Sequence, residues 1–542
     1  MRKKKIYLAL AVSFMLVLFL AGQRCIKTYM DYRVPVSSTG RVMGVAMVDN
    51  LEFLEGKELR TSETNPGVIM GGALLPYDSE GVVYLAQDFT REAWEGDILT
   101  DSKDTFLCTL SDEAWTDKAT SIREGHVFPL WLVGEDFYYE LKLVACGMPV
   151  MSISTERSEE QDLGDYETDP DRFHFDPDVL FYGDIQVFDP GDETRKYDIF
   201  ESGVRYYLRG ASSSSFEKQS YSLSLLDSKG ENMDKSLLGM RSDNSWKLKA
   251  MVADSRKIRE KTACQLWEQF DNTNTSVNEA GPRMEYLELV IDNDYVGLYG
   301  IVEPVDEKKL GLDKNDALYK STNWKIPEDE DIQYAVDMQW KIMTYIRLRY
   351  PENITDYGQS WYPMRDYLNT FYRGEGDENP IETKLNVSNY VDALLFNMTI
   401  SGSDNHFRNL YFAADVSEDG TYSMRQIPWD LDLTFTALVG NAYNDDETVV
   451  YEEAALPFLR DMKPEAVRPV LQERWAECRE TFLSTDNILQ VMRDNQQYLI
   501  NSGVVDRENE RWPDYKMNTN IDKMEDYQIR RMEWLDTYFE EF

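Results

Sequence analysis

The pattern of apolar and polar positions divides the chain into a strand-rich front part and a helical back part. From residue 41 to about residue 155, apolar or alternating runs such as GVVYLA, TFLCTL and FYYELKLVA are separated by Gly, Asp, Asn and Pro, which is typical of strands joined by turns. After about residue 361, segments such as NVSNYVDALLFNMTI carry apolar residues at helical spacing. We therefore expect an α+β protein, and 542 residues are too many for a single core.

Two segments predict β-hairpins and one predicts a linker. In EYLELVIDNDYVGLYGIVE, residues 285–303, an Asp-Asn-Asp turn joins two alternating apolar halves. A second hairpin, LYFAADV and YSMRQI around Glu-Asp-Gly, forms a strand-like insert at about 407–435 within the helical part. The acidic run from Arg157 to Asp171 has almost no apolar residues, so we expect a loop or linker there.

The N-terminus predicts a membrane segment. Four basic residues, Arg2–Lys5, precede the uncharged run Ile6–Gly22. As a helix this run would span roughly 26 Å, just under the roughly 30 Å of the hydrocarbon core. Leu20-Ala21-Gly22 is a poor match to a signal-peptide cleavage site, so we favour a single-pass anchor in the cell membrane over a cleaved signal and a secreted protein. The basic residues would stay in the cytoplasm and the remaining chain would lie outside.

Charge narrows the classes of partner. Fifty-seven Lys and Arg against 98 Asp and Glu give a net charge of −41, which argues against a nucleic-acid partner and against an anionic membrane surface. Basic proteins and divalent cations remain compatible with this charge. The three His and five scattered Cys form no CxxC or His/Cys cluster, so we expect neither a structural zinc site nor a disulfide-dense scaffold.

The 407–435 insert and the residues just before it hold the most informative chemistry. Asp404 and Asn409 lie five apart, and Asp430 and Asp432 occupy a Pro-Trp-Asp-Leu-Asp turn. A hairpin brings its ends together, so Asn409 and Asp430 should lie close. Phosphoryl transfer uses one Asp to orient the attacking hydroxyl, and an Asn and a second Asp to hold Mg²⁺. Acidic turns are nevertheless common in so acidic a chain, and a G-x-G-x-x-G loop and an H-R-D triplet are both absent.

Further segments upstream carry a family resemblance. In order along the chain they are YLRGASS (207–213), FEKQSYSL (216–223), WKLKA (246–250), DSRKIR (254–259), VGLY (296–299) with Glu303, and IPWDLD (427–432). Together with the Asp-x₄-Asn spacing, this series resembles the CotH family of bacterial secreted and spore-coat kinases. The resemblance covers about residues 147–540.

The resemblance implies an atypical protein-kinase-like fold with two lobes. The anchor would occupy residues 1–25, and a stalk with a β-rich region would occupy residues 26–146. A strand-rich N-lobe at about 147–320 and a helical C-lobe at about 321–542 would hold ATP and Mg²⁺ or Mn²⁺ between them. The β-rich region carries no chemical motif, and it is either a small sandwich or barrel or an extension of the N-lobe.

The resemblance also assigns the acidic residues. Asp404 would be the catalytic Asp that faces the acceptor hydroxyl. Asn409 and Asp430 would be metal ligands. Asp432 would support or replace one of these ligands, or it caps the turn.

The nucleotide-binding residues follow from the upstream segments. Arg209, Ser212 and Ser213 lie where the family replaces the Gly-rich loop, and the serines are otherwise a solvated turn. Lys218 would pair with the phosphates, although the family has two adjacent basic residues where this chain has Lys218-Gln219. If the second of these basic residues is the functional one, Gln219 in its place would weaken or abolish catalysis.

Four further residues have weaker assignments. Arg259 would contact phosphate or join the lobes through an ion pair, and Glu303 would touch adenine or ribose where the chain passes between the lobes. Lys247 and Lys249 are reserves for the phosphate cation, although alternating lysines on a strand usually mark its solvent face.

The predicted function is that of an outward-facing, membrane-anchored kinase. It would transfer the γ-phosphoryl group of ATP to Ser or Thr of secreted or surface proteins, with Lys/Arg- and Ser-rich acceptors favoured by the acidic charge. Two alternatives remain: a catalytically inactive coat scaffold or adhesion protein, and an enzyme of the same fold that transfers another group such as AMP.

Overall fold

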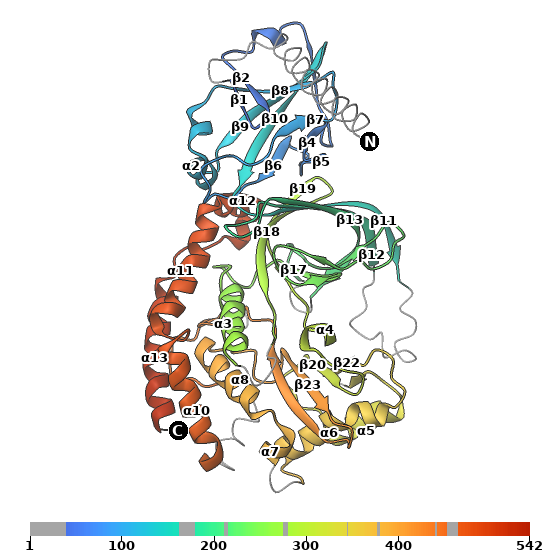
Figure 1. Cartoon of the computed structure of the whole chain (residues 1–542), viewed down its shortest axis with the longest axis vertical. Coiled ribbons are helices and arrows are strands. Elements are labelled where there is room, and N and C mark those ends of the chain that lie inside the picture. Colours follow the sequence, from blue (N-terminus) through green and yellow to red (C-terminus); the bar gives the residue numbers. More distant parts are fainter. Residues whose placement is uncertain are drawn as a thin grey trace, which may run out of the picture. The chain divides into compact units, whose positions relative to one another are not determined.

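The chain forms two compact units (Figure 1). The computed structural model describes residues 40–161, 179–210, 215–274, 280–343, 345–376, 380–438, 442–451 and 464–541. The first unit comprises Met1–Ser152, Val187–Phe200 and Val290–Tyr295. The second unit comprises Ile153–Gln186, Glu201–Leu289 and Val296–Phe542. The expectation of an α+β protein is confirmed, since both units contain strands and helices.

The first unit is built on two sheets. Its larger sheet has the order β1-β2-β8-β9-β10-β3, and β6 also pairs with β10. These strands are β1 Arg41–Val42, β2 Val45–Val48, β3 Glu58–Arg60, β6 Val82–Ala86, β8 Phe106–Leu110, β9 Val127–Val133 and β10 Phe137–Cys146. The smaller sheet, β5-β4-β7, contains β4 Val68–Met70, β5 Ala73–Leu74 and β7 Ile98–Thr100. The helices are η1 Glu52–Leu54, η2 Glu113–Thr116 and α2 Lys118–Arg123.

Two later segments of the chain complete the core of the first unit. Phe188 comes from Val187–Phe200, and Val290 and Tyr295 come from Val290–Tyr295; all three are buried in the same apolar cluster as the central strands. Tyr295 stacks on Tyr84 of β6 with ring centroids 4.9 Å apart. The first unit is therefore discontinuous in sequence.

The second unit contains a closed barrel of order β11-β12-β13-β14-β17-β19-β18. Its strands are β11 Val150–Glu160, β12 Val179–Asp189, β13 Asp198–Arg209, β14 Ser220–Leu226, β17 Ser245–Lys249, β18 Met284–Ile291 and β19 Asp294–Val302, and a separate pair joins β15 Lys235–Ser236 to β16 Ser242–Asp243. The hairpin expected at 285–303 is confirmed as β18 and β19. Its turn residues Asp292 and Asn293 both have left-handed backbones, with φ of 51° and 60°, as a tight two-residue hairpin turn requires.

The linker expected from Arg157 to Asp171 is wrong at its start. Strand β11 continues to Glu160, into the acidic run, and residues 162–178 lie outside the described residues. The side chains of residues 158–160 are exposed, while the backbone of the strand remains in the barrel. A strand needs backbone pairing more than apolar side chains at its solvent-facing end, so composition alone misplaced this boundary.

A second sheet in this unit carries the predicted insert. Its order is β21-β22-β20-β23-β24, with β20 Ala317–Ser321, β21 Ile342–Met343, β22 Ile346–Tyr350, β23 Leu410–Val416 and β24 Tyr422–Pro428. The expected hairpin is confirmed as β23 and β24, which pair from Leu410 opposite Pro428 to Val416 opposite Tyr422.

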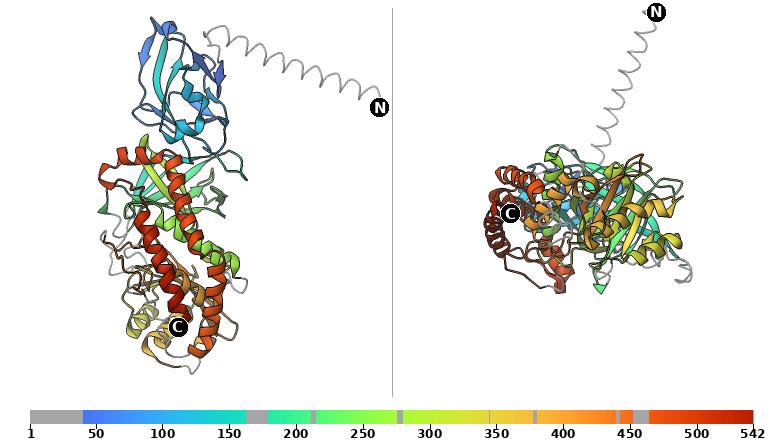
Figure 2. Two further views of the ribbon diagram at one scale, coloured as in Figure 1. Left: turned by 90° about the vertical axis from the view of Figure 1, so that its left-hand side faces the viewer. Right: turned by 90° about the horizontal axis from the view of Figure 1, so that it is seen from below.

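Helices make up most of the remaining second unit. They are α3 Arg259–Thr273, α4 Glu307–Leu310, α5 Asp329–Asp337, α6 Tyr357–Arg373, α7 Pro380–Lys384, α8 Val387–Ile400, α10 Pro464–Glu480, α11 Thr485–Asn501, α12 Val504–Arg511, η6 Pro513–Tyr515 and α13 Asp522–Glu541. The C-terminal helices α10, α11 and α13 lie together along one side of this unit, where α11 packs on α3 and α10 packs on α8 (Figures 1 and 2). No helix in the described ranges is long and apolar enough to span a membrane, and the predicted segment Ile6–Gly22 lies outside those ranges.

Candidate active site

The β23–β24 hairpin brings three of the predicted residues together. Asn409 directly precedes β23, and Asp430 follows Trp429 just beyond β24. The Trp429 N–H donates to the Asn409 carbonyl at 2.9 Å, which ties the two ends of the hairpin to each other. The Asn409 side-chain amide donates to Asp404 Oδ2 at 2.8 Å. Asp404, Asn409 and Asp430 thus form one acidic group, in which the proximity of Asn409 and Asp430 is the one that the hairpin predicted.

Two residues of this group have an unusual backbone conformation. Asn409 and Asp430 both have left-handed backbones, with φ of 59° and 58°. Non-glycine residues rarely adopt this conformation, and where they do the strain commonly serves a functional site. Here the conformation turns the chain immediately before β23 and immediately after β24.

Asp404 has the environment of a general base. Its side chain is only 6% exposed. Burial raises the pKa of Asp404 to about 6, Arg408 lowers it, and the charge of Asp430 raises it further. A carboxylate with a pKa near the working pH is a more effective proton acceptor than an ordinary surface Asp.

Lys249, at the end of β17, joins the acidic group to helix α3. Its Nζ lies 2.6 Å from Asp430 Oδ1 and also donates to Glu260 Oε1 in the first turn of α3. Burial opposes the charge of Lys249, but Asp430 and Glu260 together hold its pKa above the ordinary value. Burial also raises the pKa of Glu260, and Lys249 opposes that increase. Lys249, which the sequence analysis ranked as a reserve, is therefore a cation that contacts the acidic group through Asp430.

Asp432 lies close to the same charges, and Lys249 opposes the increase in its pKa. Burial raises its pKa well above the ordinary value, and the nearby charges of Asp430 and Glu260 raise it further. This environment is compatible with either predicted role, that of a supporting ligand or that of a turn cap.

Four additional cations lie near Lys249 and Asp430. Lys247 donates to Ser222 Oγ at 3.0 Å, and its pKa is lowered to about 7 by burial and by the charges of Arg209 and Arg349. Lys320 of β20 lies over the rings of Tyr411 and Trp429, and burial, Arg209 and Arg349 lower its pKa as well. The positive charges of these side chains therefore repel one another, and an anionic ligand bound among them would offset that repulsion.

The Ser-rich segment falls outside the described residues. Arg209 ends β13, and Asp430 is among the groups that its charge affects. Ser212 and Ser213 belong to residues 211–214, so their predicted contacts with phosphate stay predictions.

The structure gives Lys218 a different partner from the predicted phosphates. Its Nζ lies 2.6 Å from Glu508 Oε1 of α12 and donates to the Leu298 carbonyl at 2.6 Å. Both charged side chains are completely buried. Lys218 thus joins helix α12 to the barrel, and it makes no ion pair with Asp404 or Asp430.

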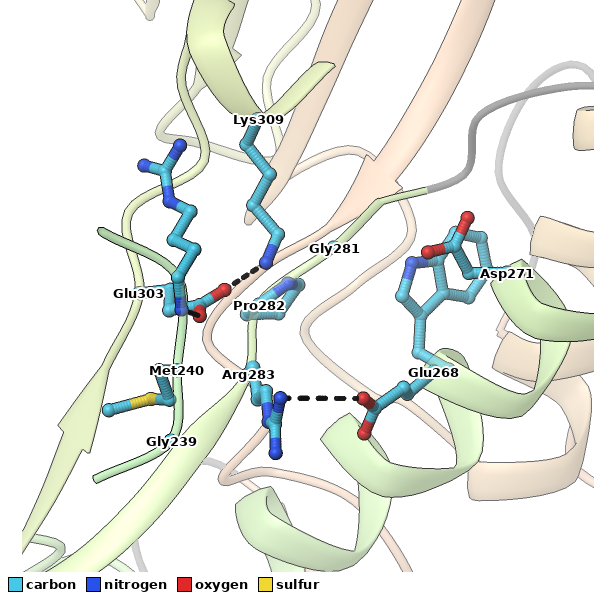
Figure 3. A pocket seen from close by; sticks show the side chains of 11 residues that line it. Gly239, Met240, Glu268, Asp271, Gly281, Pro282, Arg283, Glu303 and Lys309 are labelled. Atoms are coloured by element: carbon cyan, nitrogen blue, oxygen red, sulfur yellow. Dashed lines mark hydrogen bonds and ion pairs between the residues drawn. The ribbon is translucent and has the colours of Figure 1, made fainter. Parts of the chain in front are cut away.

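Arg259 and Glu303 also lie apart from the acidic group. Arg259 pairs with Asp254 at the start of α3. Glu303 accepts from the Arg241 backbone N–H at 2.7 Å and from Lys309 Nζ. It lines a cavity of about 380 Å³, whose opposite wall is formed by α3 (Figure 3). Neither residue makes a hydrogen bond or ion pair with Asp404, Asn409 or Asp430 in the described part of the chain.

The oxygen donors suit a hard cation held by few protein ligands. The side-chain nitrogen of Asn409 donates to Asp404, so the side-chain oxygen of Asn409 is left for a cation. Oδ1 of Asp430 accepts a hydrogen bond from Lys249, so Oδ2 of Asp430 is left for the same cation. Within the described ranges no three His, Cys, Asp or Glu side chains form a metal cluster. Mg²⁺ at nucleotide sites commonly takes one or two protein oxygens and completes its shell with phosphates and water, so Asn409 and Asp430 fit it.

Comparison with known families agrees with this geometry. The profile of the family described as CotH kinase protein matches residues 206–535. The chain belongs to the CotH kinase protein family. The resemblance predicted from the sequence is therefore confirmed, and the CotH region contains both the acidic group and the Lys249–Glu260 pair. No curated protein matched the chain.

Sequence reasoning about this CotH protein missed Glu260 and ranked Lys249 too low. The signal was weak, because Glu260 is one of several charged residues in RKIREK at the start of a helix. A buried lysine at the end of a strand and a glutamate in the next helix become a pair only when the helix packs back on the strand.

Proposed function

We propose that this CotH-family chain is a protein kinase that transfers the γ-phosphoryl group of ATP to a Ser or Thr hydroxyl. The observation that carries the proposal is the assembly of Asp404, Asn409 and Asp430 at one hairpin, linked through Lys249 to Glu260. Phosphoryl transfer depends on orientation and charge neutralisation more than on covalent catalysis, and this group supplies both.

Each side chain then has a defined task. Asp404 accepts the proton of the acceptor hydroxyl, while its hydrogen bond to Asn409 fixes its orientation. Asn409 and Asp430 would hold Mg²⁺ or Mn²⁺, which neutralises phosphate charge when bound. Lys249, held by Glu260, pairs with phosphate oxygens.

The cations around Lys249 support a nucleotide rather than a neutral ligand. Burial and the charges of Arg209 and Arg349 lower the pKa of Lys247 and Lys320 in the absence of an anion, and a triphosphate supplies that anion. The position of Lys249 also bears on Gln219, which stands where the family has the second of two adjacent basic residues. Because Lys249 already places a cation beside Asp430, the proposed catalysis does not require a second basic residue at position 219.

The proposed location is the outer face of the cell membrane, with Ile6–Gly22 as the anchor. The supporting observation is the basic–apolar order of the N-terminus. The proposed acceptors are secreted or surface proteins rich in Lys, Arg and Ser, because a net charge of −41 attracts basic chains at low salt.

The test is label transfer by the full-length chain in mild detergent. The chain is incubated with γ-labelled or α-labelled ATP, Mg²⁺ or Mn²⁺, and a basic Ser-rich protein. The matched variants are Asp404→Asn and, as a control on the same hairpin, the exposed Glu418→Gln. We expect γ-label transfer that Asp404→Asn abolishes and Glu418→Gln preserves. Transfer of α-label would instead identify AMP transfer, and nucleotide binding without any transfer would refute the kinase assignment. Absence of both binding and transfer would favour the scaffold.

A further inference from the structure

Arg408 occupies a defined place beside the proposed base. Its Nη1 lies 3.6 Å from Asp404 Oδ1, and its guanidinium carbon lies 4.4 Å from the centre of the Trp324 ring. Trp324 also donates a side-chain hydrogen bond to Asp404, and its own side chain is exposed. One exposed aromatic residue therefore contacts both the base and the arginine.

The contacts of Arg408 leave its donors available. A separation of 3.6 Å is too long for a hydrogen bond, so the pair with Asp404 is purely electrostatic. The contact with Trp324 is a cation–π contact over the ring face, and Arg408 donates no hydrogen bond within the described residues. The side chain is 22% exposed, so a ligand can reach its N–H groups.

Distance constraints limit how far the transferring phosphoryl group can lie from Asp404. An acceptor hydroxyl must lie about 2.6–3.2 Å from Asp404 to give up its proton. The phosphorus that it attacks lies about 3–3.5 Å farther on. Arg408 is 3.6 Å from the same carboxylate, so its donors lie within reach of the phosphoryl oxygens.

We propose that Arg408 is a catalytic residue that binds the transferring phosphoryl group, and that Trp324 is its positioning residue. This inference rests on the proposed kinase function. As the acceptor oxygen bonds to the γ-phosphorus, its proton passes to Asp404, and the bond from the γ-phosphorus to the β–γ bridging oxygen breaks, leaving its electrons on ADP. Arg408 forms and breaks no covalent bond. It stabilises the negative charge on the equatorial oxygens.

This task differs from that of Lys249. Lys249 is already paired with Asp430 and Glu260 on the metal side of the group, whereas Arg408 approaches from the side of the base. The two cations would therefore affect different steps. Loss of Lys249 should weaken ground-state nucleotide binding, and loss of Arg408 should raise the barrier without weakening that binding.

The test measures binding of a transition-state mimic as well as turnover. The full-length chain, Arg408→Ala, Arg408→Lys and Trp324→Ala are titrated with Mg·ADP in the presence and absence of aluminium fluoride, which mimics the planar phosphoryl group. The matched control is Arg157→Ala, an exposed arginine whose guanidinium lies 4.0 Å from the Tyr182 ring centre.

We expect aluminium fluoride to tighten ADP binding by the parent and the control. Arg408→Ala should lose that tightening and lower kcat by about 10²–10³-fold, with the Kd for Mg·ADP unchanged within twofold. Arg408→Lys should recover only part of the tightening by aluminium fluoride and only part of kcat, because a lysine lacks the planar fork of donors that a guanidinium has. Trp324→Ala should lower kcat about tenfold with unchanged ADP binding, as expected of a positioning residue.

Three results would overturn the inference. Full tightening and normal kcat in Arg408→Ala would remove Arg408 from the mechanism while leaving the kinase function intact. An equal loss of Mg·ADP affinity would make Arg408 a ground-state ligand only. A parent chain that binds no nucleotide would refute the kinase function and this inference with it.

Discussion

The ion pair between Lys218 and Glu508 allows a direct test of what holds helix α12 to the barrel. Glu508 is completely buried and receives Lys218 Nζ at 2.6 Å, Lys257 Nζ at 3.9 Å and the Leu298 N–H at 2.9 Å. Gly297 lies against it with φ of 94°, and a Cβ there would collide with the Glu508 carboxylate. One anion thus compensates two buried lysines.

Glu508→Gln removes that anion and preserves the shape of the side chain. The amide oxygen still accepts from Leu298, so packing and one hydrogen bond survive. Removing one partner of a buried ion pair costs about 3–5 kcal/mol, because the remaining charge is left uncompensated. We place this variant toward the lower end, because burial lowers the pKa of Lys218 to about 7 and also lowers that of Lys257, so either lysine can release its proton once the anion is gone.

The assay is thermal unfolding of the full-length chain followed by tryptophan fluorescence. Glu510→Gln is the matched control, because Glu510 is exposed on the same helix. Glu508→Gln should lower Tm by several degrees and Glu510→Gln should not. The double variant Lys218→Met with Glu508→Gln should recover part of the loss, because one of the two orphaned charges is gone. A Glu508→Gln protein with the Tm of the parent would refute the reasoning that the pair is ionised and stabilising.

Three further outcomes follow from the site. Asp430→Ala should reduce Mg·ATP affinity at least about tenfold while Tm is preserved, since it removes a proposed metal ligand, and calorimetric titration that matches the parent would exclude that role. Lys249→Met should weaken binding of a non-hydrolysable ATP analogue, because Asp430 and Glu260 then face each other without a cation; an unchanged Kd would contradict this. Lys247, with a pKa near 7, should take up a proton when phosphate binds, so affinity should fall as the pH rises from 7 to 9. Lys247→Met should remove that pH dependence, and equal slopes for the two proteins would reject the assignment.

Local patterns in the sequence predicted the central part of the site. The alternating runs around Glu-Asp-Gly are confirmed as β23 and β24, and a hairpin necessarily brings Asn409 near Asp430. Asp404 lies only five residues before Asn409, and its carboxylate accepts a hydrogen bond from the Asn409 side-chain amide. These contacts depend on neighbouring segments of the chain, so short-range reasoning was sufficient.

Contacts distant in sequence could not be predicted in this way. Alternation of Lys247 and Lys249 on a strand indicated a solvent face, but the folded chain buries Lys249 against Glu260 of α3. The role assigned to Lys218 ignored Glu508, which follows it by 290 residues. A charged residue in a recognisable motif therefore has a partner that only the folded chain reveals.

The discontinuous make-up of the first unit has a consequence for how the protein is made. Phe188, Val290 and Tyr295 belong to its core, so that core is incomplete until the chain has been synthesised past residue 295. By then β11 to β18 of the barrel already exist as nascent chain, and the two units must acquire structure concurrently rather than one after the other. The same interleaving means that the first unit cannot be excised as a cassette. A chain begun at residue 153 would retain Phe188, Val290 and Tyr295 with their apolar neighbours removed, and we would expect such a fragment to aggregate.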